Sequence, residues 1–404
     1  GLFQNKRMAM LTALIASLNP WFFQFSRLAF ESFFSIFFYL FGICILLLAR
    51  GKYKLFAILP FFLGFFQYQG HKLLLVPFVF LLTLYFLYDR IVGAKPRRSK
   101  LSVDELSVVV VLIFTVVLTG IFAVRLPNQE AIKRTSHITI LNDELLSAKV
   151  NEERRLSIEN PLQKFFTNKV SVVVDDSMSK FFGSFNPVYL FFGGGNSSDS
   201  WAVTSKGKFY MLDAVLIIIG WIILTNKKTR KELLLLVSMV VVAPLPAMLP
   251  EGALWATFRS AFIIPILIIV AGVGMWHIST VVSKKIFSIL LLVYFVAMIP
   301  FFYDYFFRYP IYNTRDTYFY ERVVASYLYR ANYQEKVTFL ADETRHLFIT
   351  ILFYNGWLTG ETYAQISNDV ANSRYVYKNF EAKGECFDPS ILQESSVVLA
   401  QTNL

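Results

Sequence analysis

The chain has 404 residues, of which 55% are hydrophobic and 17% are charged, and its net charge is +11. A soluble globular domain is usually about 45–50% apolar with about 25% charged residues, so this composition is typical of a membrane protein. The basic residues are spread over short loops between apolar stretches. This distribution favours contact with anionic membrane lipids and argues against nucleic acid as a partner.

Nine apolar stretches approach the roughly 20 residues that a helix needs to cross a bilayer. They cover residues 8–25, 32–49, 55–70, 73–88, 108–124, 210–225, 233–249, 260–277 and 286–302. Several are short, which helix tilt or snorkelling of flanking side chains can accommodate. We therefore predict a polytopic α-helical membrane protein with about nine transmembrane helices, in two regions that cover residues 1–124 and 210–302.

The basic loops orient these helices. Sixteen Lys and Arg residues fall in the loops around 6–7, 50–54, 90–100, 227–231 and 284–285. The alternating short loops hold only Arg27, Lys72 and Arg259. Because short loops rich in Lys and Arg stay in the cytoplasm, the pattern places these three residues at the outer face and the C-terminus outside.

Residues 125–209 are long enough to form an outer loop domain. Within them, Leu141–Thr167 has the pattern of an amphipathic helix broken near Pro161. The β-prone run VSVVV follows, and then Asp175 and Asp176, which would be either a solvated strand end or a metal-binding pair. The glycine run at 193–195 lacks the lysine and serine of a phosphate-binding P-loop.

Residues 303–404 have a different pattern, in which helices and strands alternate. We expect helices at Thr317–Ala331 and Thr344–Asn355, and a strand at Lys336–Ala341. Weaker strand patterns follow near residues 374–377 and 396–400. Such alternation predicts a small α/β module, which we place on the outer surface of the membrane.

The three outer basic residues are the first candidates for a binding site. Arg259 is either a snorkelling arginine or a phosphate ligand, because its planar fork can hold two oxygens. Arg27 and Glu31 are four residues apart, so on one helix they would share a face, either as a surface ion pair or as a phosphate contact beside an acidic group that holds a metal ion. Lys72 and His71 belong to a tight turn that is either a hairpin cap or part of the same site.

Other common motifs are missing from the sequence. Cys44 lies in a predicted span and Cys386 in the tail, so we expect no disulfide. The sequence contains no zinc motif, Ser/His/Asp series or dinucleotide fingerprint.

The stretches around these residues resemble polytopic glycosyltransferases of the GT-C superfamily, and among them bacterial relatives of dolichyl-phosphate-mannose protein mannosyltransferase. The resemblance lies in NPWFFQFSRLAFESFF, FFLGFFQYQGHKLLLVP and FRSAFIIPILIIVAGVG. Residues 166–224 also resemble the outer loop of that branch in the order of an N-K pair, an F-x-P-x-x-L-F-F core and a G-x-x-Y sequence, and LFITILFY in the tail matches too.

The resemblance implies transfer of a hexose from a polyprenyl-phosphate donor to a protein, lipid or glycan acceptor, at the outer face of a bacterial plasma membrane. Arg259 matches an arginine that meets the lipid phosphate, and Lys72 falls near a basic residue of the corresponding turn. Glu31 lies near a second acidic residue of the family and is an accessory catalytic candidate and a weak candidate ligand for a divalent metal ion. The main catalytic carboxylate would precede Gly1, so we expect an N-terminally truncated piece.

The sequence departs from the family at Asp199 and Ser200, where relatives often carry Arg-His. We predict a lipid-phosphate site formed by Arg259, Lys72 and Arg27, with His71 as a further donor. Two alternatives stay open. One is a transporter or lipid flippase, although the spans carry almost no charge at mid-membrane and show no inverted repeat. The other is a non-catalytic scaffold of the same fold.

Overall fold

The computed structural model describes residues 3, 5–28, 30–92, 101–125, 143–158, 160–193, 203, 206–250, 256–312, 319–331, 336–341, 344–384 and 397–400. The chain divides into two compact units, Gly1–Asp304 and Tyr305–Leu404. Each unit is described by itself below.

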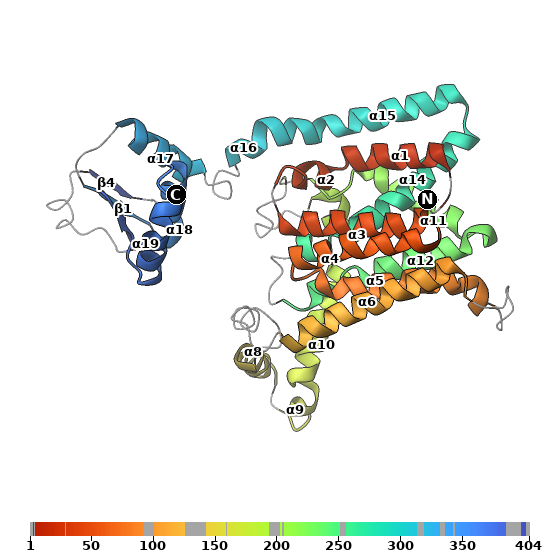
Figure 1. The fold of residues 1–404 in the computed structure, drawn as a ribbon, viewed down its shortest axis with the longest axis horizontal. Helices are drawn as coiled ribbons and strands as arrows, with labels where there is room; N and C mark the ends of the chain where they lie inside the picture. The colour runs from red at the N-terminus through yellow and green to blue at the C-terminus, as the bar shows by residue number, and fades with distance from the viewer. Residues whose placement is uncertain are drawn as a thin grey trace. The chain divides into compact units, whose positions relative to one another are not determined.

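The first unit is a bundle of apolar helices (Figure 1). Its main helices are α1 (Lys6–Leu18), α2 (Pro20–Phe25), α3 (Glu31–Leu48), α4 (Ile58–Gln67), α5 (Lys72–Ile91), α6 (Val103–Arg125), α11 (Met211–Leu224), α12 (Arg230–Val242), α13 (Ala256–Arg259), α14 (Ile263–Val281) and α15 (Lys284–Tyr303). Short 3₁₀ turns cover Gly51–Ala57, Lys227–Thr229 and Leu245–Met248, and π-helical turns cover Val188–Phe192 and Asp304–Arg308.

Within the described part of the chain, 6 helices are long and apolar enough to cross a membrane, which supports an integral membrane protein. They are Glu31–Leu48, Lys72–Ile91, Val103–Arg125, Lys227–Met248, Ile263–Val281 and Lys284–Ile311. The three other predicted spans are shorter helices. The first is interrupted at Asn19, whose side chain caps α2, and α4 and α11 have 10 and 14 residues. The count of nine therefore stays a prediction.

The two ends of the bundle carry different loops. The start of α1, the end of α5 and the α14–α15 connection lie at one end, whereas α2, the end of α6 and α10 lie at the other (Figure 1). The basic loops predicted to be cytoplasmic therefore share the first end, and Arg27, Lys72 and Arg259 belong to loops at the second. We refer to the second end as the lip end.

Helix α14 is the centre of the bundle, and most of its side chains are buried. Small residues let its neighbours approach closely, as is common between helices in membranes. A Cβ atom on Gly220 of α11 would lie 2.0 Å from the carbonyl oxygen of Val270, and one on Gly274 would lie 2.1 Å from that of Leu216. A Cβ on Gly272 would meet the side chain of Thr12 in α1.

The described part of the segment between α6 and α11 forms a helical arm, which consists of α8 (Asp143–Arg155), α9 (Gln163–Phe166) and α10 (Lys169–Gly183). The predicted break near Pro161 is confirmed, but the predicted strand at VSVVV is wrong, because these residues form the first turns of α10. A capping box between Asn168 and Ser171 starts this helix. Burial of Val172 against α8 then outweighs the β propensity of the valines.

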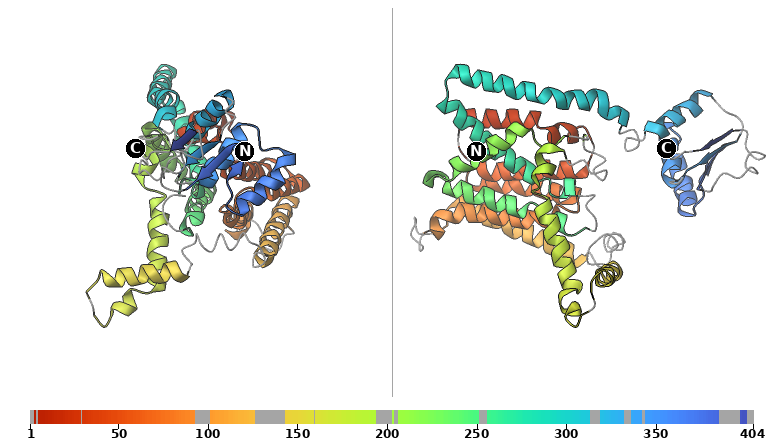
Figure 2. Two further views of the ribbon diagram at one scale, coloured as in Figure 1. Left: turned by 90° about the vertical axis from the view of Figure 1, so that its left-hand side faces the viewer. Right: turned by 180° about the vertical axis from the view of Figure 1, so that it is seen from behind.

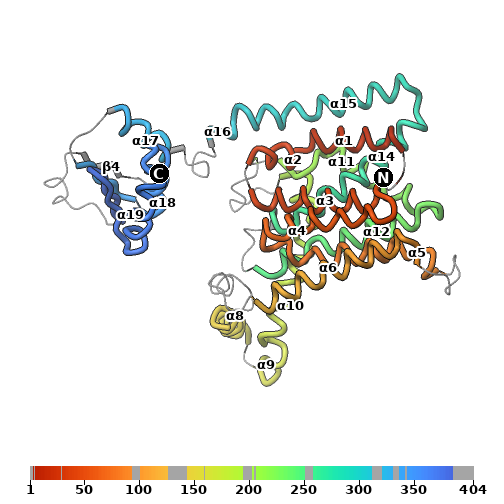
Figure 3. Tube along the Cα trace, viewed as in Figure 1, coloured from red at the N-terminus to blue at the C-terminus, as the bar shows by residue number. Residues whose placement is uncertain are grey.

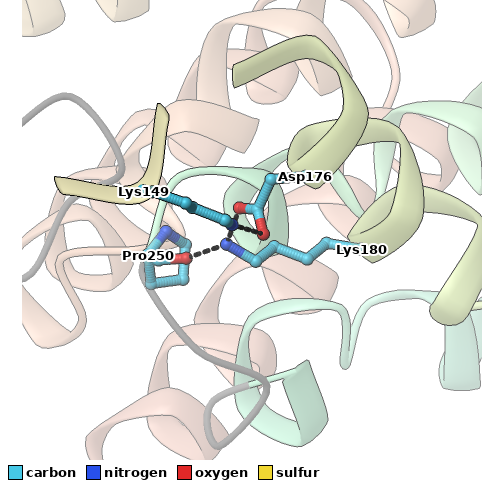
Figure 4. Close-up of polar contacts among 4 residues, drawn as sticks. All are labelled: Lys149, Asp176, Lys180 and Pro250. Carbon is cyan, nitrogen blue, oxygen red and sulfur yellow. Dashed lines mark hydrogen bonds and ion pairs between the residues drawn. The ribbon is translucent and has the colours of Figure 1, made fainter. Parts of the chain in front are cut away.

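Ion pairs hold the arm together, and a hydrogen bond attaches it to the bundle. Lys180 of α10 donates both to Asp176 and to the carbonyl oxygen of Pro250, and Lys149 of α8 lies 3.1 Å from the same carboxylate (Figure 4). Asp176 is thus a helical residue held by two lysines rather than a strand end. Groups of three or more His, Cys, Asp or Glu side chains that could hold a metal ion do not occur among the described residues.

The second unit combines helices with a small sheet (Figure 1), and Figure 3 shows the course of its backbone. It contains α16 (Tyr309–Tyr312), α17 (Phe319–Ala331), β1 (Val337–Leu340), α18 (Thr344–Tyr354), α19 (Gly360–Ala371), β2 (Val376–Tyr377), β3 (Phe380–Lys383) and β4 (Val397–Ala400). The strand order is β2-β3-β1-β4, with β1 parallel to both β3 and β4. The sequence patterns located these elements except for α16, α19 and β3. Phe339, Phe348 and Phe380 form the centre of its core.

Candidate functional site

The three segments singled out at the lip end meet around Phe258. Its ring lies 4.7 Å from that of Phe30 and 5.2 Å from that of Phe25. Its carbonyl oxygen accepts a hydrogen bond from Nε2 of His71 at 3.0 Å. The structure therefore brings the ends of α2 and α3, the α4–α5 turn and the segment before α14 into one cluster, although they lie far apart in the sequence.

Arg259 lies against the α4–α5 turn. Its Nε donates to the hydroxyl of Tyr68 at 3.4 Å, and a Cβ on Gly70 would lie only 3.5 Å from its Cγ. The side chain is half-buried. Neither terminal nitrogen makes a hydrogen bond or an ion pair with the described residues, so the donor fork that suits phosphate is available.

Lys72 is in a different environment from the one predicted. Its ammonium donates to the side-chain oxygen of Gln69 at 2.7 Å and lies 3.8 Å from the centre of the Phe122 ring and 5.3 Å from that of Phe65. The side chain is buried. Cation–π contacts and the amide thus satisfy a charge that would otherwise be costly at this depth. The predicted role of Lys72 as a phosphate ligand stays a prediction, and in this arrangement its ammonium faces Gln69 and the phenylalanine rings.

His71 is a packing residue at the start of α5. It is fully buried, and its ring lies 4.8 Å from the rings of both Tyr68 and Phe262. Burial lowers the pKa of His71 to about 3, so the imidazole is neutral at physiological pH. It holds Phe258 through one nitrogen and brings no charge to a phosphate.

Arg27 and Glu31 do not share a helix. Helix α2 ends at Phe25 and α3 begins at Glu31, with a turn between them, so the expected face with four-residue spacing does not form. The guanidinium of Arg27 lies over the ring of Phe23, 4.2 Å from its centre. Glu31 is exposed at the first position of α3, where a carboxylate is favoured by the helix dipole, and it pairs with none of the described side chains.

A buried carboxylate, Asp213 in α11, was not singled out from the sequence. One of its oxygens accepts from the hydroxyl of Tyr294 at 2.9 Å, and the other accepts from the backbone N–H of Tyr210 at 2.9 Å. The hydroxyl of Tyr210 donates to the carbonyl of Leu18. This network ties α1, α11 and α15 together. Its signal in the sequence was a lone acidic residue at the start of an apolar run.

Two cavities lie in the bundle outside the Phe258 cluster. One of about 590 Å³ lies between α1, α3, α5, α12 and α14 and is lined by apolar side chains such as Met8, Leu236 and Met239. The other, of about 320 Å³, is lined by Lys206, Tyr210 and several phenylalanines. The five predicted site residues line neither cavity.

Comparison of the chain with protein-family models, with curated proteins and with solved structures found no match.

Proposed function

We propose that this chain belongs to a membrane glycosyltransferase of the GT-C type, which moves a hexose from a polyprenyl-phosphate donor to a protein, lipid or glycan acceptor at the lip end of the bundle. The observation that carries the proposal is the placement of Arg259. A half-buried guanidinium, with two nitrogens that make no hydrogen bond to the described residues, lies at the lip end of the bundle, in the segment whose sequence resembles that of the family.

The chemistry assigned to Arg259 is stabilisation of the leaving phosphate. As the bond between sugar and phosphate breaks, negative charge grows on the phosphate oxygens, and a fixed donor pair lowers the energy of that state. Tyr68 accepts from Nε and so holds the guanidinium with its other two nitrogens free to donate. Lys72 and His71 support this geometry by packing the turn that carries Tyr68.

The acceptor also needs a base. The resemblance assigns that role to a carboxylate, with Glu31 as an accessory acidic group that could share a divalent metal ion. General-base activation of a hydroxyl contributes typically 10²–10⁴-fold to a rate. In this proposal, Arg259 belongs to the phosphate-binding part of the site.

The test is transfer of a radiolabelled hexose from a short-chain polyprenyl phosphate by the full-length protein in membranes. Arg259→Ala should lower kcat/KM by about 10²–10³-fold, the range seen when one donor to a developing anion is removed. Arg259→Lys should recover part of the loss, because it restores the charge without the fork. Unchanged turnover in Arg259→Ala would contradict the phosphate assignment.

The matched control is Lys72→Met, a basic residue of the same lip end that the structure places among phenylalanines. We expect kcat/KM within about twofold of the unmodified protein, because methionine preserves the packing and the lost charge does not face the donor. A loss as large as that of Arg259→Ala would return Lys72 to the phosphate site. Movement of labelled lipid without a covalent product would instead indicate a flippase.

A further inference from the structure

An apolar stripe on α10 has no partner in the described chain. Val170, Val174, Met178 and Phe182 follow one another at four-residue spacing and are 71%, 51%, 46% and 66% exposed. Four residues are slightly more than one helical turn, so these side chains lie along one side of the helix. Phe165 and Phe166, at the tip of the arm, are 75% and 66% exposed.

The opposite side of α10 is covered by α8. Val172 packs with Leu146 and Val150 of α8, and Lys169 pairs with Asp143. Each residue turns the helix by about 100°, which places Val172 roughly opposite Val174 and Val170. The stripe is therefore the face that α8 leaves uncovered.

The orientation of the arm determines which way the stripe faces. Helix α10 runs across the lip end of the bundle rather than along the spans, and it extends beyond the bundle to one side (Figures 1 and 2). Helix α8 lies on the side of α10 away from the spans (Figure 2). A bilayer around the spans would have one of its surfaces at the lip end. The face of α10 opposite α8 is turned towards that surface.

The neighbouring surface of the bundle is one that lipid would cover. Val117, Ile121 and Val124, in the half of α6 nearest the arm, have exposed side chains, as expected of a lipid-facing span. Lys164 is exposed beside Phe165 and Phe166. A helix with such a pairing of lysine and large apolar residues can lie in the headgroup region of a membrane.

We infer that the stripe of α10, together with Phe165 and Phe166, rests in the headgroup region of the leaflet at the lip end. Its partner is the lipid surface, with phosphate headgroups near Lys164 and the upper parts of the acyl chains against the valines. The lipid-facing surface of α6 then continues onto the arm. This inference does not depend on the proposed glycosyltransferase activity.

The experiment places a fluorescent reporter on each side of α10 in the full-length protein. Cys44→Ser and Cys386→Ser give the background, and Val174→Cys or Val170→Cys is labelled with bimane. Ser179→Cys is the matched control, because Ser179 is exposed and lies nine residues from Val170, about two and a half turns and hence on the other side of the helix. The protein is reconstituted in vesicles of phosphatidylethanolamine and phosphatidylglycerol.

Lipids with a spin label near the headgroup should quench the reporters at 170 and 174 at least about twofold more than the one at 179, because a helix is about 10 Å across and quenching is short-ranged. Aqueous iodide should show the reverse order. Equal iodide quenching at all three positions, without lipid quenching, would overturn the inference. Shielding of 170 and 174 from both quenchers would also overturn it, because it would mean that a protein surface covers the stripe.

Discussion

Two basic side chains of the lip end, Lys72 and Arg259, show how residue type and position alone leave a role undetermined. Both were singled out because the short loops predicted at the outer face carry few basic residues. In the structure, the ammonium of Lys72 contacts phenylalanine rings and the amide of Gln69. The guanidinium of Arg259 has two nitrogens that make no hydrogen bond to the described residues and can donate to a ligand. The difference arises chiefly from Phe122 of α6, about 50 residues further along the chain, so no local pattern could reveal it.

His71 gives a residue-scale prediction about pH. Its folded-state pKa of about 3 lies below its ordinary value of 6.5, so between these values the unfolded chain binds a proton that the folded chain excludes. Stability should therefore be lost as the pH falls from about 6.5 towards 3, by an amount on the order of a few kcal/mol.

The measurement is thermal unfolding in detergent as a function of pH, for the unmodified protein and for His71→Gln. Glutamine can still donate to the carbonyl of Phe258 but does not titrate. We expect a smaller decrease in Tm between pH 6.5 and 4.5 in the variant. Parallel curves for the two proteins would show that His71 is not the group responsible.

At the scale of elements, the approach of α11 to α14 depends on Gly220. Its missing Cβ would lie 2.0 Å from a backbone oxygen, which cannot move aside as a flexible side chain could. Gly220→Ala should therefore destabilise the bundle by roughly 1–3 kcal/mol or more, the usual cost of overpacking.

Gly120 of α6 is the matched control, because a Cβ there would meet nothing within 4 Å. Gly120→Ala should be neutral or stabilising by up to about 1 kcal/mol, since alanine is the better helix former. Thermal unfolding of both variants in one detergent gives the comparison. An equal change in Tm for the two variants would contradict the close packing of α11 on α14.

The attachment of the arm provides a second prediction at this scale. Lys180 joins Asp176 to the carbonyl of Pro250, so Lys180→Met should weaken the attachment by about 1–3 kcal/mol, a typical value for hydrogen bonds to a charged group. Hydrogen exchange should then be faster in α10. Glu153→Gln is the control, because Glu153 of α8 is exposed and pairs with none of the described side chains, and it should leave exchange in α10 unchanged.

The elements also show where sequence patterns succeed. Long apolar runs and the helix–strand alternation of the tail predicted most helices and strands near their observed bounds, because burial in lipid or in a small core selects the same periodicity that the sequence displays. The pattern failed at VSVVV, where a cap at Asn168 and packing on α8 outweighed β propensity. It also failed at α16, α19 and β3, whose patterns are weak in isolation.

For the whole molecule, the division at Asp304 predicts independent responses to core substitutions. Phe348 is fully buried in the second unit and stacks on Phe380, with 5.8 Å between the ring centres. Phe348→Ala should destabilise that unit by about 3–5 kcal/mol, the usual cost of removing a buried phenylalanine.

Hydrogen exchange of the full-length variant, followed by mass spectrometry, measures this effect separately for each unit. Exchange should rise in β1, α18 and β3 and stay unchanged in α14. Tyr327→Ala is a suitable control, because this tyrosine of the same unit is half exposed. Faster exchange in α14 of the Phe348 variant would mean that the two units unfold together.

The enclosure of α14 has a consequence for the order of assembly. The elements shown to pack on it, α1 and α11 through glycine contacts and α5 through the ring of Phe78 against Phe262 at its start, all precede it in the chain. During synthesis, α14 therefore emerges after the surfaces that receive it have been made. Its insertion completes the centre of the bundle, and α15, the next helix to emerge, then covers Asp213 through the hydroxyl of Tyr294.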